Sequence, residues 1–271
     1  MPGSLKRFQV VLTMLLFAGS ALFAFTVASL QQVDGQGVWD TSEEVTIEGF
    51  LTVDPYPVLH RSAEAENGQA QSVLMVMVGK HSADVVAEKH ANTMVSVRGF
   101  SVSRGGWLML ELADETAVTP LDTAADVADP AMPGNAESLG TVTLVGEVVG
   151  SKCFLGVMNP GGGPVHRACA EVCLLGGVPP MLVVKDRQQR KFGYMLTSSD
   201  GSSAAEQLTN IAAESVQVTG ELTRNGDLLY LAIGKLDNVN QAVASVARTP
   251  PTLFASQGVE PWSDEICTVV R

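Results

Sequence analysis

The sequence predicts a mostly β protein, in which an N-terminal transmembrane helix precedes two tandem small β-barrel modules and the second module carries a Cys/His-rich helical insertion. Three observations predict this architecture. An uncharged apolar run lies near the N-terminus, two patterns of alternating apolar residues occur twice in the chain, and three of the four cysteines lie in one short segment. The 271 residues, 46% of them hydrophobic, are enough to build two small cores.

The apolar run covers residues 8–30 and follows a Lys-Arg pair at residues 6–7. At a rise of about 1.5 Å per residue, a helix of this length can cross a hydrocarbon core of about 30 Å. No Lys or Arg follows until Arg61, and positive flanks stay in the cytoplasm. The prediction is a signal-anchor with a cytoplasmic N-terminus and a periplasmic or extracellular bulk. A cleaved signal peptide is the alternative, with small residues near a cut at residues 27–29.

The charge balance restricts the expected partners. The formal net charge is −12 and the sequence pI is about 4.7. An acidic chain repels phosphate backbones and anionic lipid surfaces, so nucleic acid is not an expected partner. The expected partners are the membrane, through the N-terminal helix, and another envelope protein.

Two pairs of segments match at corresponding places in the chain. Residues 45–53 (VTIEGFLTV) match residues 142–150 (VTLVGEVVG), with alternating apolar residues and glycine at the fifth position. Residues 94–113 match residues 215–234, and each of these reads as strand, tight glycine turn and strand. Such a repeat predicts two copies of one β-module, and the strand spacing resembles a small OB-like Greek-key barrel.

The matches set the predicted domain boundaries. These are a stub and membrane anchor at 1–33, a first module at 43–118, an acidic linker at 119–139, a second module at 140–236 and a C-terminal tail at 237–271. The linker contains proline and acidic residues without Lys or Arg, which is typical of a solvated segment. Short helices are expected at residues 84–93 and 206–215, before the last hairpin of each module.

The second copy is longer than the first. Gly49 and Gly99 are 50 positions apart, whereas the matching Gly146 and Gly220 are 74 apart, a difference of 24 residues. An insertion at residues 151–180 accounts for most of the difference. Loops added to a rigid barrel commonly carry function.

The insertion holds the predicted site. Its ligand-type side chains are Cys153, His166, Cys169 and Cys173. A glycine-rich turn at residues 161–163 leaves the first cysteine free to fold back, and the His-x2-Cys-x3-Cys spacing places the other three on one face of a short helix. Three thiolates and an imidazole suit a tetrahedral zinc ion or a thiophilic copper ion.

The motif CAEVC, which begins at Cys169, is similar to the Cys-x-Glu-x-Cys core of the binuclear copper site in cytochrome oxidase subunit II and nitrous oxide reductase. Glu171 and Cys173 complete the match. The resemblance implies copper, with two bridging thiolates and a glutamate carbonyl ligand. The histidine of that family falls at Gly177 here, and Met181 lies one residue beyond its methionine position, so the resemblance covers five residues.

Disulfides are the alternative use of the same cysteines, because neighbouring cysteines pair in an oxidising compartment. Cys153, Cys169, Cys173 and Cys267 permit three pairings, among which the sequence does not choose. A bridge from Cys153 to either helix cysteine would close a loop of 16 or 20 residues and add about 3 kcal/mol.

The predicted function is therefore a membrane-tethered extracytoplasmic binding or assembly module with a Cys/His site for copper or zinc. Binding is favoured over catalysis because no phosphate loop, Ser-His-Asp set or catalytic carboxylate pair can be placed. One alternative is a thiol–disulfide redox protein that uses Cys169 and Cys173. Another is a structural envelope interaction protein with disulfides.

Overall fold

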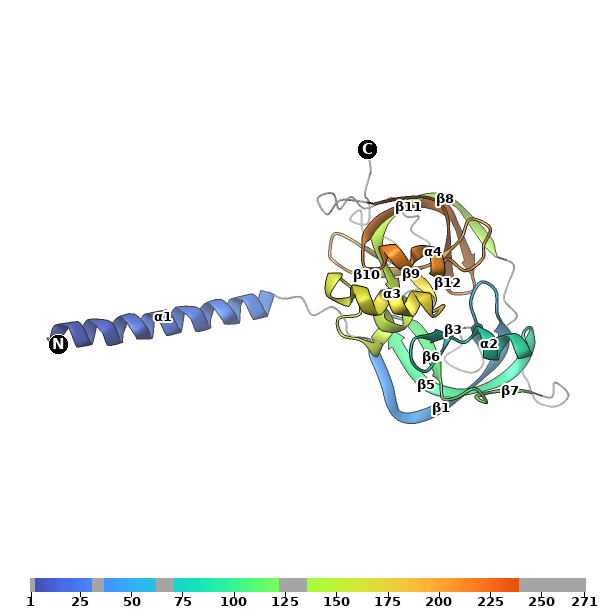
Figure 1. Ribbon diagram of the computed structural model, residues 1–271, viewed down its shortest axis with the longest axis horizontal. Coiled ribbons are helices and arrows are strands. Elements are labelled where there is room, and N and C mark those ends of the chain that lie inside the picture. Colours follow the sequence, from blue (N-terminus) through green and yellow to red (C-terminus); the bar gives the residue numbers. More distant parts are fainter. Residues whose placement is uncertain (1–2, 31–36, 62–70, 122–135, 239–271) are drawn as a thin grey trace. The chain divides into compact units, whose positions relative to one another are not determined.

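The computed structural model describes residues 3–30, 37–61, 71–121 and 136–238. It divides the chain after Gly35 into two compact units, an N-terminal unit and a β unit. The structure confirms a mostly β chain with one apolar N-terminal helix and a closed five-stranded barrel. The elements are labelled in Figure 1.

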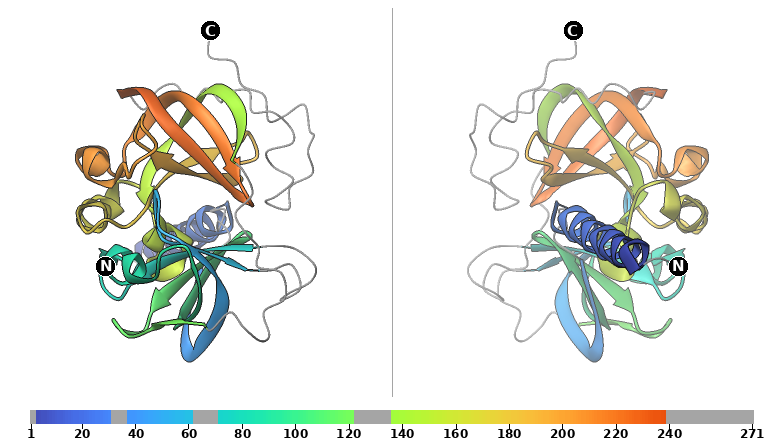
Figure 2. Two further views of the ribbon diagram at one scale, coloured as in Figure 1. Left: turned by 90° about the vertical axis from the view of Figure 1, so that its right-hand side faces the viewer. Right: turned by 90° about the vertical axis from the view of Figure 1, so that its left-hand side faces the viewer.

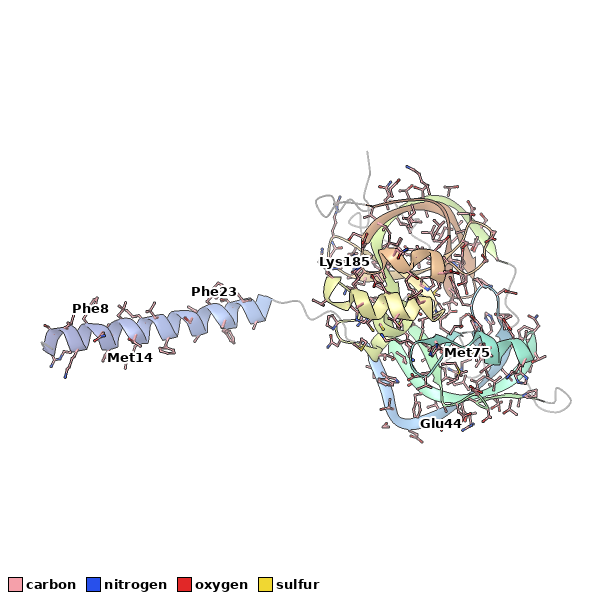
Figure 3. The ribbon with its side chains drawn as sticks, in the orientation of Figure 1. Phe8, Met14, Phe23, Glu44, Met75 and Lys185 are labelled. Atoms are coloured by element: carbon pink, nitrogen blue, oxygen red, sulfur yellow. The ribbon has the colours of Figure 1, made fainter. Side chains whose placement is uncertain are left out.

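The N-terminal unit contains helix α1 (Gly3–Leu30). The most apolar 18-residue window within its segment Gly3–Ser29 has a mean hydropathy of 2.3, and this is the one described helix long and apolar enough to cross a membrane. Large apolar side chains such as Phe8, Met14 and Phe23 project outward from it (Figure 3). A signal sequence near the N-terminus has the same length and composition, so α1 fits both predicted roles.

The first sheet of the β unit has seven strands. They are β1 (Val38–Thr52), β2 (Val58–Arg61), β3 (Gln71–Met77), β4 (His81–Ser82), β5 (Thr93–Arg104), β6 (Trp107–Leu112) and β7 (Val118–Pro120). Strand β1 pairs antiparallel with β2 and with β5, and β2 pairs antiparallel with β3. Strand β6 pairs parallel with β3 and antiparallel with β5. The core of this sheet includes the fully buried Met75 (Figure 3).

The second sheet is the closed barrel, in the order β10-β12-β11-β8-β9. Its strands are β8 (Glu137–Gly150), β9 (Pro180–Lys185), β10 (Lys191–Thr197), β11 (Ser215–Asn225) and β12 (Leu228–Asn238). Strand β8 pairs antiparallel with β9 and β11, β10 pairs antiparallel with β9 and parallel with β12, and β11 pairs antiparallel with β12.

The two predicted terminal hairpins are present as β5–β6 and β11–β12. In the first, Gly105 and Gly106 form the turn with φ angles of 52° and 87°. In the second, Asn225 pairs with Leu228, so the two-residue turn begins at Gly226 (φ 60°). The pairing places the positive φ at the start of the turn, where glycine adopts it without steric cost.

The predicted short helices are also present. Helix α2 (Asp84–Ala87) and η2 (Glu88–His90) precede β5, while α4 (Ala205–Leu208) and η5 (Thr209–Ile211) precede β11. Several strands extend past the predicted module limits. Strand β1 begins at Val38, β8 begins at Glu137 inside the predicted linker, and β12 continues to Asn238.

The two sheets of the β unit lie directly against each other (Figure 2). One apolar core cluster contains side chains from both sheets, including Val76 and Met109 of the first and Met181 of the barrel. Across the same interface the hydroxyl of Tyr56 donates to the carbonyl oxygen of Leu196 at 2.5 Å. Packing and hydrogen bonds therefore hold the two sheets together.

Candidate metal centre

The four predicted ligands lie in the connection between β8 and β9, residues 151–179, called here the Cys/His segment. It contains the π-helical turn η3 (Cys153–Val157), the turn η4 (Pro164–His166) and helix α3 (Arg167–Leu175). The sequence predicted α3, and the structure confirms it. In Figure 1 the segment lies between the barrel strands and the first sheet.

Cys153 returns beside α3 through the glycine-rich turn, as the sequence predicted. Gly161 lies against the carbonyl oxygen of Cys153, and a Cβ at this position would clash with it. The backbone amide of Gly163 donates to the carboxylate of Glu147 on β8, which fixes the other end of the turn. Glycine is therefore required where the turn passes the first cysteine.

The structure brings ligand atoms of Cys153, His166 and Cys169 together, and Cys173 lies next to Cys153 but is not part of this group. The Sγ of Cys153 lies 3.6 Å from that of Cys169 and 3.5 Å from that of Cys173. One ligand atom each of Cys153, His166 and Cys169 lie within 4.8 Å of one another. Two sulfurs bound to one tetrahedral zinc ion stand about 3.8 Å apart. The Cys153–His166–Cys169 group can therefore hold a metal ion after small side-chain adjustments.

The described cysteines form no disulfide. Cys153, Cys169 and Cys173 are free thiols, and their sulfur separations far exceed the bond length of about 2.05 Å. The fourth cysteine, Cys267, lies outside the described residues. The structure therefore contains none of the predicted bridges among Cys153, Cys169 and Cys173, and a bridge to Cys267 stays a prediction.

His166 supplies the observation that most favours metal binding at this place. The side chain is 4% exposed, and its buried Nε2 atom has no hydrogen-bond partner among the described residues. A buried polar atom without a partner costs about 1–3 kcal/mol. Burial, aided by the charge of Lys80, lowers the pKa of His166 and favours the neutral imidazole, which is the form that binds metals.

A cation from the turn between β3 and β4 contacts the sulfur of Cys169, and sequence reasoning missed it. The Nζ of Lys80 donates to the Sγ of Cys169 at 2.7 Å and to its carbonyl oxygen at 3.2 Å. Burial acts to lower the pKa of Lys80, but the hydrogen bond to Cys169 and the charges of the three cysteines outweigh it, so this pKa is raised. Lys80 therefore stays charged beside the sulfurs.

The pKa values of the two buried thiols, Cys153 and Cys173, shift in opposite directions. A hydrogen bond from Cys153 lowers the pKa of Cys173 to about 7, with the charges of Lys80 and Lys152 acting against burial. The same hydrogen bond, together with burial, raises the pKa of Cys153. Cys173 therefore has a pKa close to neutral pH, where a large share of it is thiolate, the form that binds metals.

A buried ion pair fixes the Cys/His segment to the first sheet. The Nζ of Lys152 donates to the Oε1 of Glu111 at 2.6 Å, and both side chains are at most 4% exposed. The same ammonium donates to the carbonyl oxygens of Met77 and Gly79 at 2.7 and 2.6 Å. All three of its protons therefore have acceptors, and Cys153 follows directly in the chain.

The comparisons with known proteins identify no family. No protein-family model matches the chain, and no curated protein sequence matches it. Among solved structures, a deletion mutant of the single-stranded DNA binding protein from Thermus aquaticus is similar at 13% identity, with a TM-score of 0.22, over 77% of this chain and 97% of that chain. A likeness at this TM-score says nothing about the site, so the chemistry of the site follows from its own geometry.

Proposed function

We propose that this protein is a membrane-tethered extracytoplasmic binding or assembly module that holds a metal ion in its Cys/His segment. The observation that carries the proposal is the unpartnered, buried Nε2 of His166, in a side chain grouped within 4.8 Å of the sulfurs of Cys153 and Cys169. A bound ion would satisfy the imidazole and the thiolates together.

In this proposal Cys173 is the fourth ligand. Its sulfur lies 3.5 Å from that of Cys153, and its lowered pKa favours the thiolate. Three thiolates and one imidazole form a closed, four-coordinate set of the kind that holds structural zinc, and thiolates also suit a copper ion. A closed set leaves no open position for substrate, which favours a binding role over catalysis.

The proposal includes two tandem copies of one OB-like module. The strand pairings support it, because β1, β2, β3, β5 and β6 pair with one another in the same pattern and directions as β8, β9, β10, β11 and β12. The Cys/His segment then occupies, in the second copy, the place of the short connection between β1 and β2. Metal binding would thus be an addition to a duplicated scaffold.

The orientation rests on charge. Lys6 and Arg7 precede the apolar helix, and positive flanks remain in the cytoplasm, so the β unit would lie in the periplasm or outside the cell. Exposed apolar side chains on the Cys/His segment, such as Val165 at 85% and Leu175 at 67%, fit a docking partner from the cell envelope.

Elemental analysis tests the metal proposal. The full chain, purified in detergent micelles under reducing and anaerobic conditions, is expected to carry zinc or copper in an equimolar amount. Cys153→Ser and His166→Gln are expected to lose the ion because each removes a ligand. His90→Gln, outside the group, is the control. A wild-type chain without bound metal, even after addition of zinc or copper, would contradict the proposal.

Thiol–disulfide exchange is the second candidate function, and the contact of Lys80 with Cys169 favours it, because the ammonium donates directly to that sulfur. Cys169 is also the one partly exposed thiol of the three. Its partner would be Cys153, at 3.6 Å, in place of the predicted Cys173. Thiol counts with and without reductant separate the candidates: a reversible Cys153–Cys169 disulfide supports exchange, and three metal-protected thiols support the metal centre.

A further inference from the structure

The ammonium group of Lys80 lies against the sulfur of Cys169. Its Nζ makes both of its hydrogen bonds to Cys169, one to the sulfur and one to the carbonyl oxygen. Among the described residues, no carboxylate lies within 4.0 Å of this ammonium, although eight ion pairs are formed elsewhere. Lys80 therefore contributes a positive charge that the thiols, rather than an acidic side chain, compensate.

Contacts on both sides hold Lys80 in place. The backbone amide of Ser82 donates to the carbonyl oxygen of Gly176 at 2.8 Å, and Gly176 packs so closely on the carbonyl of Lys80 that a side chain there would clash. On the other side Lys152 donates to the backbone carbonyls of Met77, at the end of β3, and of Gly79, which directly precedes Lys80. The charge of Lys152 is itself compensated by Glu111. Of these two lysines, Lys80 is therefore the one whose charge is available to offset the charge of the thiolates.

We infer that Lys80 is a positioning residue of the metal centre, which donates to the metal-bound thiolate of Cys169 and thereby completes the site from the first sheet. This inference rests on the proposed function. Three thiolates and a divalent ion carry a net charge of −1, and a partly buried charge is costly unless a partner offsets it. With Lys80 the sum is zero, so metal binding also fastens the Cys/His segment to the first sheet.

Zinc affinity of the full chain in detergent micelles, measured by competition with a chelator, tests the inference. Lys80→Met is expected to bind zinc about 10- to 100-fold more weakly, the usual loss when a partner of a metal ligand is removed. Lys80→Arg is expected to recover most of the affinity, because it keeps the charge and the donor. Lys89→Met, which removes an exposed lysine of η2, is the matched control and is expected to bind as the wild type does.

Cobalt substitution distinguishes an electrostatic role from a structural one. The thiolate-to-cobalt charge-transfer bands are expected to shift in Lys80→Met, because the Cys169 sulfur loses its donor, and to return in Lys80→Arg. Lys80→Gln is measured in parallel, as a polar replacement that keeps the fold if methionine does not. Wild-type affinity and unshifted bands in both neutral variants would overturn the inference and leave the proposed function standing. A wild-type chain that binds no zinc, cobalt or copper would overturn both.

Discussion

The two sheets of the β unit differ most in the connection after their first strand. After β1 the chain passes through a short connection, residues 53–57, into β2, whereas after β8 it runs through the Cys/His segment before β9. The short connection supplies Tyr56, a buried side chain that bonds to the barrel. The long one supplies three thiols and an imidazole. The first sheet thus contributes support, including Lys80 and Glu111, and the barrel contributes the ligands.

Lys152→Met breaks this division of roles and has the largest expected effect. The substitution leaves the carboxylate of Glu111 buried without its cation, and loss of one partner from a buried ion pair costs about 3–5 kcal/mol. The free energy of unfolding, measured by denaturant titration of the full chain in micelles, is expected to fall by that amount. The double variant Lys152→Met with Glu111→Leu is expected to be more stable than Lys152→Met alone, because no charge is then left buried.

Lys235→Met is the matched control for the buried pair. Lys235 pairs with Asp237 at 2.8 Å, but the two side chains are 71% and 45% exposed. An exposed pair contributes about 0–1 kcal/mol. Equal losses for the two lysine variants would mean that the buried pair does not fasten the Cys/His segment to the first sheet.

His60 on β2 tests the acid sensitivity of the first sheet. Burial lowers the pKa of His60 from 6.5 to about 4. Between these values the unfolded chain binds a proton that the folded chain does not, so the free energy of unfolding falls as the pH drops from about 6.5 to about 4, by about 3 kcal/mol in total. Above pH 6.5 this contribution does not change with pH.

His60→Gln is expected to flatten that pH dependence, measured by denaturant titration at several pH values without metal. Part of the pH dependence is expected to remain in this variant, because the pKa of His166 is lowered as well. The exposed His81 offers the control, and His81→Gln is expected to keep the wild-type slope. An unchanged slope in His60→Gln would show that protonation of His60 does not limit the acid stability of the first sheet.

The sequence predicted local features of the site and missed the distant ones. Helix α3 and the return of Cys153 were predictable because spacing and a glycine-rich turn lie within one short segment. Lys80 could not be placed, since it reaches Cys169 from 89 residues away in the chain. Glu111 is likewise 41 residues from Lys152. The one local signal was a lysine between an apolar strand and Cys153, which is unusual unless the ammonium is paired.

Tyr56→Phe sharpens the comparison at the interface of the two sheets. The hydroxyl of Tyr56 donates to the carbonyl of Leu196 at 2.5 Å and accepts from the amide of Ala204 at 3.0 Å. Both hydrogen bonds are buried. Phenylalanine keeps the ring but leaves a buried amide and a carbonyl without this partner, which costs about 1–3 kcal/mol. Denaturant titration measures the loss. A wild-type free energy of unfolding would show that the short connection contributes packing alone.

Alanine at the turn glycines of the two terminal hairpins, Gly105 and Gly226, has the smallest expected effect. Gly105 and Gly226 both begin a two-residue turn with positive φ, at 52° and 60°. Alanine in this region of φ costs about 1 kcal/mol at either position.

A Cβ at Gly105 would meet open space, whereas at Gly226 it would lie 3.3 Å from the hydroxyl of Ser72 on the first sheet. The neighbouring Asp227 also accepts a hydrogen bond from the amide of Ser72 at 3.0 Å, so this contact cannot relax freely. Gly226→Ala is therefore expected to lower the free energy of unfolding more than Gly105→Ala, and equal losses in denaturant titration would mean that the barrel hairpin does not rest on the first sheet.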